Sequence, residues 1–597
     1  MGPVLLAGTA STNPRDLPEL TIRAVLTGMV IGALLTPCNV YSGLKIGWTF
    51  NMSVAAGLIG LAFWTAMQRA WGGAALGLRE NNINQTAASA SASIISSGLA
   101  APIPALALLT GQTLAFPVLA LWLFVVSILG VVVAAGLRNQ LLVREHLPFP
   151  AGVVTAETMK QIHAGGSEAS ARVRLLSICA GLSATLKVVV TRFAIGPLAP
   201  PISVTITKAG GGTTSISAMN LGLALDPSVL MVGFGAISGL RIALSVLGGS
   251  LVGWAVLAPI ALSYGWVPPG PDDANVSWFG PLVEWLLWPG ATMMVAASLT
   301  AFAVSVTQMI LRRHEEAKPA ARPERGLGHR ELWVALGVVM VLSVGTQAAL
   351  FNIGIVEGVL AVLLSYVLAI VAARVSGETA ITPIGALGKI TQLTFGAISP
   401  GNITANLMTA NVTGGAAGQC ADLMHDLRTG QLVGATPGFQ IIAQLFGVLT
   451  GSLAGAFTYL LLIPDPQHQL VTSEWPAPAV ATWKAVAEVL SKGWDAMPPG
   501  AMPAIVVGGV LGIGLALYET LSSSPLKRYL PSASAFGFGF VIPAWIAISL
   551  VVGAVAAAVT ERLYPQWAER RIVVVAAGLI VGESLAGVIG AAMSILS

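Results

Sequence analysis

The sequence predicts an all-α, polytopic membrane protein of about sixteen transmembrane helices, some of them broken or re-entrant. Of its 597 residues, 55% are hydrophobic and only 9% are charged, and the mean hydropathy is +0.80. Apolar runs long enough to cross a bilayer, about 20 residues each, recur from Thr21 almost to Ser597. A water-soluble globule could not bury so much apolar surface. In lipid the backbone polar groups must be satisfied internally, which selects helices.

Residues 1–20 are a polar segment that we expect in the cytoplasm. They carry Arg15, Asp16 and Glu19 where a secretory signal would have a basic region, an apolar stretch and a small-residue cleavage site. We therefore expect no cleaved signal. The small net charge of +4 comes mostly from short loops, which predicts anchoring of those loops in the cytoplasm and excludes a nucleic-acid partner.

One long hydrophilic stretch, residues 312–331, divides the chain into two transmembrane halves, residues 21–311 and residues 332–597. It reads RRHEEAKPAARPERGLGHRE, and its excess of Lys and Arg predicts a cytoplasmic linker. Residues 138–174 have a similar excess, whereas the loop around Asp272 has no Lys or Arg. These two regions should face opposite sides of the membrane.

Two pairs of similar segments, in the same order, predict that the halves arose by duplication. REHLPFPAG (144–152) is similar to RYLPSASAF (528–536), and RLLSICAGLSATLK (174–187) is similar to RIVVVAAGLIVGES (571–584). If both the amino terminus and the linker are cytoplasmic, each half crosses the membrane an even number of times, about eight. Such repeats are typical of transporters, which bind substrate near the midplane between related halves.

A third, weaker similarity joins GLKIGWTF (43–50) and LGKITQLTF (387–395). The second of these segments contains Lys389 and Gln392. Chance similarity is the alternative explanation, because the spacing to the next Asn-rich stretch differs between the two halves.

The first polar interruption of an apolar run is TPCNVYSGLKIGW (36–48). Pro37 should loosen the helix, and Asn39, Tyr41 and Lys45 stand in an apolar setting. A lysine near a helix end often extends to the membrane surface. The alternative, of similar weight, is a site for an anionic substrate.

The second interruption, RENNINQTAASASASIISS (79–97), is rich in amides and hydroxyls. Its small residues, from Ala87 to Ser93, predict close helix packing. The polar side chains before them are harder to explain by packing, and we favour the wall of a binding pocket, because amides both donate and accept hydrogen bonds. They are Glu80, Asn81, Asn82, Asn84 and Gln85.

The third interruption, HLPFPAGVVTAETMKQIH (146–163), has two prolines and a glycine before Glu157. We expect a broken or re-entrant segment. An acid at membrane depth is a functional candidate. A cytoplasmic cap in which Lys160 pairs with Glu157 is equally compatible with the sequence.

The fourth interruption is GNITANLMTANVTGGAAGQCADLMHDLR (401–428). Its amides Asn402, Asn406 and Asn411 are similar to those of the second interruption. Asp422 and His425 share one side of a helix and could relay a proton or bind a metal chelate. We favour the alternative that they and the adjacent Asp426 are solvated.

The last interruption, GLIVGESLAG (578–587), places Glu583 deep in an apolar run. In the alignment of the two halves Glu583 lies beside the position that matches Lys187, which predicts a charge pair between the halves. A buried acid that only joins neighbouring helices is the alternative.

Other classes of protein are poorly supported. The three cysteines have no metal-binding spacing and are expected to be small core residues, and no phosphate-binding loop is present. A membrane-embedded enzyme acting on lipid or peptide would need a nucleophile with its base or a set of metal ligands, and the sequence shows neither pattern. A passive channel would need a wet lumen rather than a few dry ionisable groups. Because the sequence has no phosphate-binding loop to bind ATP, transport should be driven by an ion gradient.

Six segments in order resemble the oligopeptide transporter family, which includes the plant yellow stripe-like carriers. They are NVYSGLKIGW, ENNINQTAASA, LPFPAGVVTAE, DLMHDLRTGQLVGATP, RYLPSASAFGFGF and AAGLIVGESLAGV. The resemblance implies about sixteen helices in two related halves and import of short peptides, glutathione-like peptides or metal complexes of nicotianamine together with protons. The Asn-Pro-Gly and Lys-Ile-Pro-Pro-Arg motifs of the fungal and plant peptide branch are absent from the sequence. The chain thus resembles the bacterial and yellow stripe-like side.

We therefore expect a proton-coupled symporter of short oligopeptides or peptide-like metal chelates, such as siderophore complexes, in a cell membrane. Its richness in alanine and glycine favours a bacterial inner membrane. We expect no cofactor, no resident metal and no catalytic residue, with lipid, substrate and H⁺ as partners and a homo-oligomer left open. The predicted substrate contacts are Asn39, Tyr41, Lys45, Asn81, Asn82, Gln85, Lys389, Gln392, Asn402 and Asn406. The predicted proton-coupling residues are Glu80, Glu157, Asp422 and Glu583.

Overall fold

The computed structural model describes residues 18–47, 49, 51–164, 166–208, 211–312, 328–379 and 382–596. These residues are mostly helical, and twelve of the helices are long and apolar enough to cross a membrane. The predicted fold class, an all-α polytopic membrane protein, is confirmed. The number of about sixteen crossings stays a prediction, because helices such as α15 (Ile403–Val433) are long enough to cross but strongly polar.

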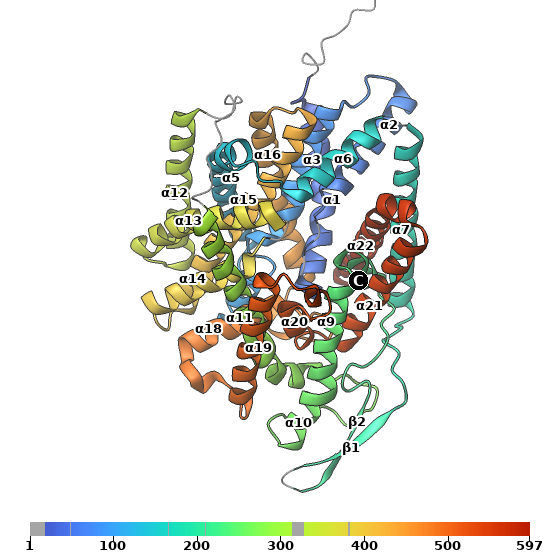
Figure 1. Ribbon diagram of the computed structural model, residues 1–597, viewed down its shortest axis with the longest axis vertical. Helices are drawn as coiled ribbons and strands as arrows, with labels where there is room; N and C mark the ends of the chain where they lie inside the picture. The colour runs from blue at the N-terminus through green and yellow to red at the C-terminus, as the bar shows by residue number, and fades with distance from the viewer. Residues whose placement is uncertain are drawn as a thin grey trace, which may run out of the picture.

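The helices pack into two groups. The first bundle combines segments from both predicted halves and occupies the upper and left part of Figure 1. From the first half it contains α1 (Ile22–Ile46), α2 (Ser53–Trp71), α3 (Leu78–Ala92), η1 (Ser93–Ser97), α4 (Pro102–Thr110), α5 (Phe116–Arg138), η2 (Asn139–Arg144) and α6 (Pro150–Ala164). From the second half it contains α12 (His329–Phe351), α13 (Ile355–Thr379), α14 (Ile384–Ile398), α15, α16 (Pro437–Leu462), α17 (Pro466–Gln469), α18 (Pro478–Lys492) and η4 (Gly493–Ala496).

The second bundle also draws on both halves. Its first-half elements are α7 (Gly166–Arg192), α8 (Val229–Ser238), α9 (Leu240–Ser250), η3 (Leu251–Leu257), α10 (Ala258–Ser263) and α11 (Phe279–Arg312). Its second-half elements are α19 (Ala501–Leu521), η5 (Pro525–Arg528), α20 (Ala533–Gly539), α21 (Ala544–Leu563) and α22 (Pro565–Leu596). The closest pairs are α7 with α22, α11 with α19, and α8 with α21.

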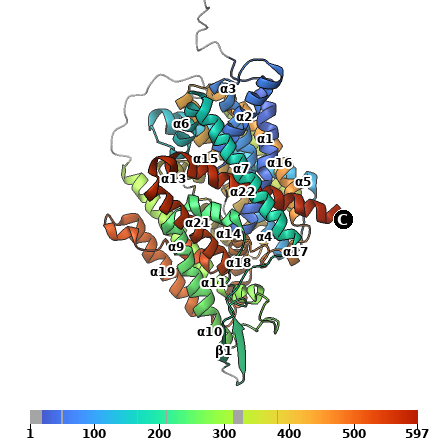
Figure 2. The same cartoon turned by 90° about the vertical axis from the view of Figure 1, so that its right-hand side faces the viewer.

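An antiparallel hairpin of β1 (Ser203–Thr207) and β2 (Thr213–Ser217) joins α7 to α8. It pairs Ser203 with Ser217 at one end, and it projects beside α10 from the lower end of the molecule in Figures 1 and 2. Just after it, the Asn220 amide donates to the backbone oxygens of Asp273 and Val276 at 2.9 and 2.7 Å. These bonds hold the loop before α11 against the connection between β2 and α8.

The two bundles do not coincide with the two predicted halves, since helices on either side of the linker pack together in each. The division of the chain at residues 312–331 stays a prediction about its sequence. Most of this linker, and most of residues 1–20, lie outside the described residues.

The small residues of α3 explain its place at the centre of the first bundle. In lipid the hydrophobic effect contributes little to helix association, so close packing of small residues has to stabilise the contact between helices. A Cβ on Gly28 of α1 would lie 2.6 Å from the Asn84 backbone oxygen, and one on Gly447 of α16 would lie 2.1 Å from that of Ala87. Both neighbours therefore approach the backbone of α3, and the predicted packing surface at Ala87 to Ser93 is confirmed.

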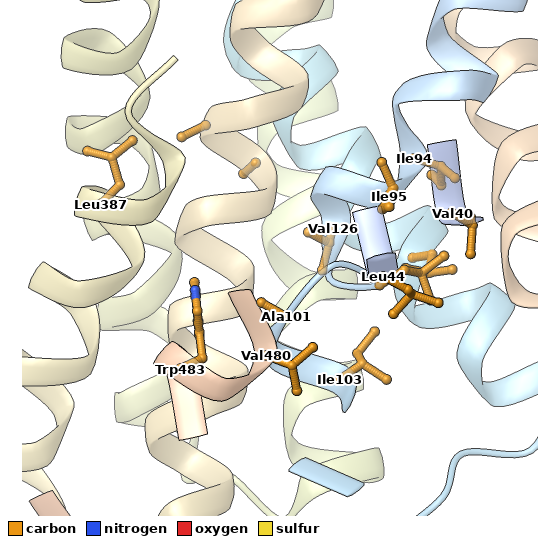
Figure 3. Packing of buried hydrophobic residues seen from close by; sticks show 14 of the residues in the cluster. Val40, Leu44, Ile94, Ile95, Ala101, Ile103, Val126, Leu387, Val480 and Trp483 are labelled. Atoms are coloured by element: carbon orange, nitrogen blue, oxygen red, sulfur yellow. The ribbon is translucent and has the colours of Figure 1, made fainter. Parts of the chain in front are cut away.

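A continuous apolar core joins α1, η1, α4 and α18 near the middle of the first bundle. Figure 3 shows part of it, with side chains from widely separated segments gathered together: Val40, Leu44, Ile94, Ile95, Ile103, Val480 and Trp483. The core fixes the carboxyl end of α1 against the start of α18, where the Ala477 backbone N–H donates to the Leu44 oxygen at 3.0 Å.

Three of the predicted interruptions are breaks between helices, although their positions differ from those expected. After α3 the chain passes through η1 and Gly98, whose φ of 135° ends the helical path before α4. Before α6, His146 and Phe149 have φ of 51° and 45°. At the fourth interruption the break precedes α15, in the turn around Gly401.

The other two interruptions are not breaks. Pro37 lies inside an unbroken α1, which ends only at Gly47 (φ 68°), and α22 continues through Glu583. The expected loosening at Pro37 was therefore wrong, since α1 is packed closely on both sides of the proline: a Cβ on Gly32 would lie 2.5 Å from Ser91, and one on Gly43 would lie 2.2 Å from Ile95.

Candidate functional site

A cavity of about 460 Å³ lies where the two bundles meet. We call it the Lys45 cavity. Its walls come from the carboxyl end of α1, from α7, from the connection into α8, from the loop before α18 and from α22. Its polar lining includes Tyr41, Lys45, Lys187, Asp226, Ser228, Glu474 and Glu583.

Lys45 is held against aromatic rings at one wall. Its ammonium lies 4.7 Å from the centroid of the Trp475 ring and 5.7 Å from that of Tyr41. It also donates to the Glu474 backbone oxygen. The two rings meet edge to face at 5.3 Å, and such cation–π contacts orient an ammonium without neutralising it. The Lys45 charge therefore remains available to an anionic group in the cavity.

The Glu583 carboxylate caps the amino terminus of α8. Its two oxygens accept from the Ser228 hydroxyl and from the Leu230 backbone N–H, both at 2.7 Å. Only 5% of the Glu583 residue is exposed. A carboxylate at a helix amino terminus satisfies unpaired N–H groups and the helix dipole, so Glu583 ties α22 to α8.

The remaining charges give the cavity both signs. Lys187 reaches it from α7, and Asp226 and Glu474 reach it from loops. In the connection between β2 and α8, burial and the nearby carboxylate of Glu583 raise the pKa of Asp226 above its ordinary value. Lys187 and Glu583 line the same cavity, while the contacts described for Glu583 are to Ser228 and Leu230; their predicted charge pair stays a prediction.

The amides of α3 lie elsewhere, in a buried polar cluster inside the first bundle. The Asn82 amide donates to Gln85 at 3.0 Å, and the Gln85 amide donates to Asp426 of α15 at 2.6 Å. The Ser53 hydroxyl donates to the same Asp426 oxygen at 3.2 Å. Asp426 is 1% exposed and His425 4%, so the solvated position that we favoured for these two residues was wrong.

Several other predicted residues have partners that explain their burial. Glu80 forms an ion pair with Arg23 at 2.6 Å and accepts from Thr21. The Asn81 amide donates to the Gly57 backbone oxygen, and that of Asn39 donates to the Ala92 oxygen. These contacts join α1, α2 and α3.

A third set surrounds Lys389 on α14. Gln392 donates to Asn406 at 3.2 Å, and the Asn406 amide donates back to the Gln392 backbone oxygen at 2.6 Å. Lys389 is 3% exposed and lies 4.2 Å from the centroid of the Trp483 ring. These three predicted residues therefore come together, apart from the lining of the Lys45 cavity.

The last three predicted residues do not line the Lys45 cavity. Asn402 is exposed and caps α15 by accepting from the Ala405 N–H at 3.0 Å. Glu157 is exposed on α6, and Asp422 is half-buried on α15. The predicted substrate and coupling residues therefore do not share one cavity: Asn82 lies in the polar cluster inside the first bundle, Asn402 caps α15, and Glu583 lines the Lys45 cavity.

Sequence reasoning missed Asp226, Ser228, Glu474, Trp475 and Trp483. A signal did exist for two of them, because Asp-Pro-Ser directly before an apolar run is typical of a helix start. Cys38 and Cys420 are buried, as expected, whereas Cys179 is only partly buried. Among the described residues, no group of three or more His, Cys, Asp or Glu side chains is arranged to hold a metal ion.

The fold and the cavity define a polytopic helical membrane protein with a charged cavity between two bundles. The profile described as OPT oligopeptide transporter protein matches residues 19–594. The chain therefore belongs to the oligopeptide transporter family, and its role is transport.

Two relatives match over nearly their whole length. YGL114W of Saccharomyces cerevisiae, provisionally named as an oligopeptide transporter, is 24% identical over 97% of this chain and 96% of its own. The metal-nicotianamine transporter YSL2 of Arabidopsis thaliana is 22% identical over 95% of this chain and 92% of its own. The chain is thus similar to proteins named for two kinds of cargo.

Proposed function

We propose that the protein is a proton-coupled symporter that takes up short oligopeptides or peptide-like metal chelates through the Lys45 cavity. The main support is a cavity at the junction of two helix bundles whose lining carries both lysines and carboxylates. A peptide has an ammonium and a carboxylate, and chelates related to nicotianamine have several of each. Opposite charges in one cavity suit both kinds of cargo.

The size of the cavity also supports this proposal. Small-molecule sites in proteins commonly measure about 300–1,000 Å³, and the Lys45 cavity measures about 460 Å³. A cargo carboxylate would face Lys45 and Lys187, and a cargo ammonium would face Asp226. Because the two bundles contribute different walls, a relative movement of the bundles would open the cavity to alternate sides of the membrane.

Glu583 is our candidate for the coupling residue. When ionised it holds the amino terminus of α8 through Ser228 and Leu230. Protonation removes the negative charge that these donors and the helix dipole favour. The contact between α22 and α8 would then weaken, which links proton binding to movement at the cavity. Glu80, Glu157 and Asp422 remain weaker candidates, because they lie outside this cavity.

The predicted topology belongs to the same proposal. Residues 1–20 and the linker 312–331 face the cytoplasm, with a bacterial inner membrane as the expected location. The excess of Lys and Arg in the linker supports this orientation.

Uptake into proteoliposomes under an imposed pH gradient tests the proposal. Labelled dipeptides, tripeptides and ferric chelates are offered with the interior alkaline, and a protonophore provides the control. A proton symporter accumulates its solute above the external concentration, and the protonophore abolishes this accumulation. Equilibration without accumulation would indicate a channel, chemical conversion of the solute would indicate an enzyme, and dependence on sodium would replace the proton; each result contradicts the proposal.

A further inference from the structure

Lys389 is a buried ammonium group without a hydrogen-bond partner. The residue is 3% exposed, and its Nζ makes no hydrogen bond to the described residues. The Nζ lies over the ring of Trp483. This ring can pack against α14 because residue 388 is a glycine: a Cβ there would be 2.3 Å from the Trp483 ring. Burial of a charged ammonium without an acceptor is costly. An anion beside it would offset that cost.

The ammonium lies at a cavity of about 550 Å³, which we call the Lys389 cavity. Its walls come from α11, α14, α18 and α20, so it too lies between the two bundles. No Asp or Glu is among the described residues that line it. An anion entering this cavity would therefore meet one buried positive charge and no competing carboxylate.

The Lys45 and Lys389 cavities share a boundary segment. Glu474 and Pro476 line the first cavity, whereas Pro478 and Trp483 line the second. On each side of this short segment a lysine lies over a tryptophan, Lys45 over Trp475 and Lys389 over Trp483. The same chemical arrangement thus occurs at two neighbouring positions.

The cavities are also ordered along α11, one of the candidate membrane spans. Residues 275–277, just before this helix, line the Lys45 cavity, and Met294 to Ser298 line the Lys389 cavity. Ser305 and Gln308, further along, line a third cavity that also includes Ser298. Along a helix that spans a membrane, successive positions correspond to successive depths.

We propose that the Lys389 cavity is a second binding site for the carboxylate of the transported solute, occupied after the Lys45 cavity during passage along α11. This inference rests on the proposed transport function. It predicts different roles for the two lysines: Lys45 determines how readily the solute is loaded, and Lys389 determines how fast the loaded solute moves on.

The first test measures the electrostatic preference of the cavity without using transport. Ser298→Cys is introduced after replacement of Cys38, Cys179 and Cys420 by serine, and is labelled with an anionic or a cationic methanethiosulfonate reagent. Lys389→Gln should lower the ratio of anionic to cationic labelling rates about tenfold. Lys389→Arg should preserve the ratio, as should the control Lys160→Gln, at an exposed position of α6. An unchanged ratio in Lys389→Gln would overturn the anion site, and Ser238→Cys, which lines the Lys389 cavity but not the third cavity, provides a second probe position.

The second test compares uptake of labelled triglycine and of its carboxyl-terminal amide. For the acid, Lys389→Gln should lower the maximal rate about tenfold and change KM by less than about twofold, whereas Lys45→Gln should mainly raise KM. Equal losses for the acid and the amide would contradict carboxylate binding at Lys389. If the wild-type protein takes up neither the triglycine nor any other solute of the panel, the proposed function fails, and the labelling ratio alone then decides whether the anion site exists.

Discussion

Replacement of Glu583 by Gln should abolish proton coupling while leaving the protein folded. Gln keeps the shape of the side chain: its oxygen can accept from the Leu230 N–H, and its amide can donate to the Ser228 hydroxyl. The loss is the negative charge beside the amino terminus of α8. A hydrogen bond to a charged group contributes about 1.5–3 kcal/mol, against about 1 kcal/mol for a neutral one.

Glu583 makes two such hydrogen bonds, each 2.7 Å long. Summed over both, the loss of interaction free energy when Gln replaces the carboxylate is about 2 kcal/mol, after allowance for the desolvation cost that Gln avoids. Glu583→Gln permanently resembles the protonated state, in which the contact between α8 and α22 is weakened. The variant should therefore shift the equilibrium from the tight to the weakened contact by about 30-fold at every pH. Wild-type protein should undergo the same shift only when Glu583 takes up its proton.

The assay is uptake and solute exchange in proteoliposomes across a range of pH. Glu583→Gln should lose accumulation driven by the pH gradient and the pH dependence of uptake, but should retain exchange of solute across the membrane. Ser228→Ala is the matched control, since it removes one hydrogen bond, about 1 kcal/mol, and keeps the titratable carboxylate. Unchanged pH dependence in Glu583→Gln would rule out Glu583 as the coupling residue, as would an equal loss of coupling in Ser228→Ala.

Three further outcomes follow from the contacts. Lys45→Gln should raise the KM for solutes with a free carboxylate about tenfold, through the loss of about 1.5 kcal/mol of charged contact, and should leave the amide analogue unaffected in the same uptake assay. Glu80→Gln removes the ion pair with the part-exposed Arg23; it should lower stability by about 2 kcal/mol, measured by thermal denaturation, and an altered pH dependence of uptake would show that Glu80 takes part in coupling. Asn402→Ala removes the cap of α15 and should cost about 1 kcal/mol with normal uptake, whereas a raised KM would restore Asn402 to the substrate site.

The sequence predicted the fold class because apolar length and scarcity of charge are properties of the chain itself. It also located α3 as a surface for close packing, since a run of Ala and Ser permits little else. It could not predict which helices form each bundle. The pairing of α7 with α22 and of α11 with α19 depends on contacts between residues hundreds of positions apart.

For the site, the sequence identified Lys45 and Glu583 from the cost of charge in an apolar run, and both line the Lys45 cavity. It grouped Asn82 and Asn402 with them only because amides suit a pocket. Amides equally suit the inside of a bundle, as Asn82 shows with Gln85, or a helix cap, as Asn402 shows. Residue type does not distinguish these environments; the tertiary packing does.

A structure determined with the solute that the uptake panel identifies would show whether that solute binds in the Lys45 cavity. We expect density for the solute in the Lys45 cavity, with its carboxylate beside Lys45 and its opposite end toward Asp226. Solute bound instead among Asn82, Gln85 and Asp426, with the Lys45 cavity empty, would show that the Lys45 cavity is not the binding site.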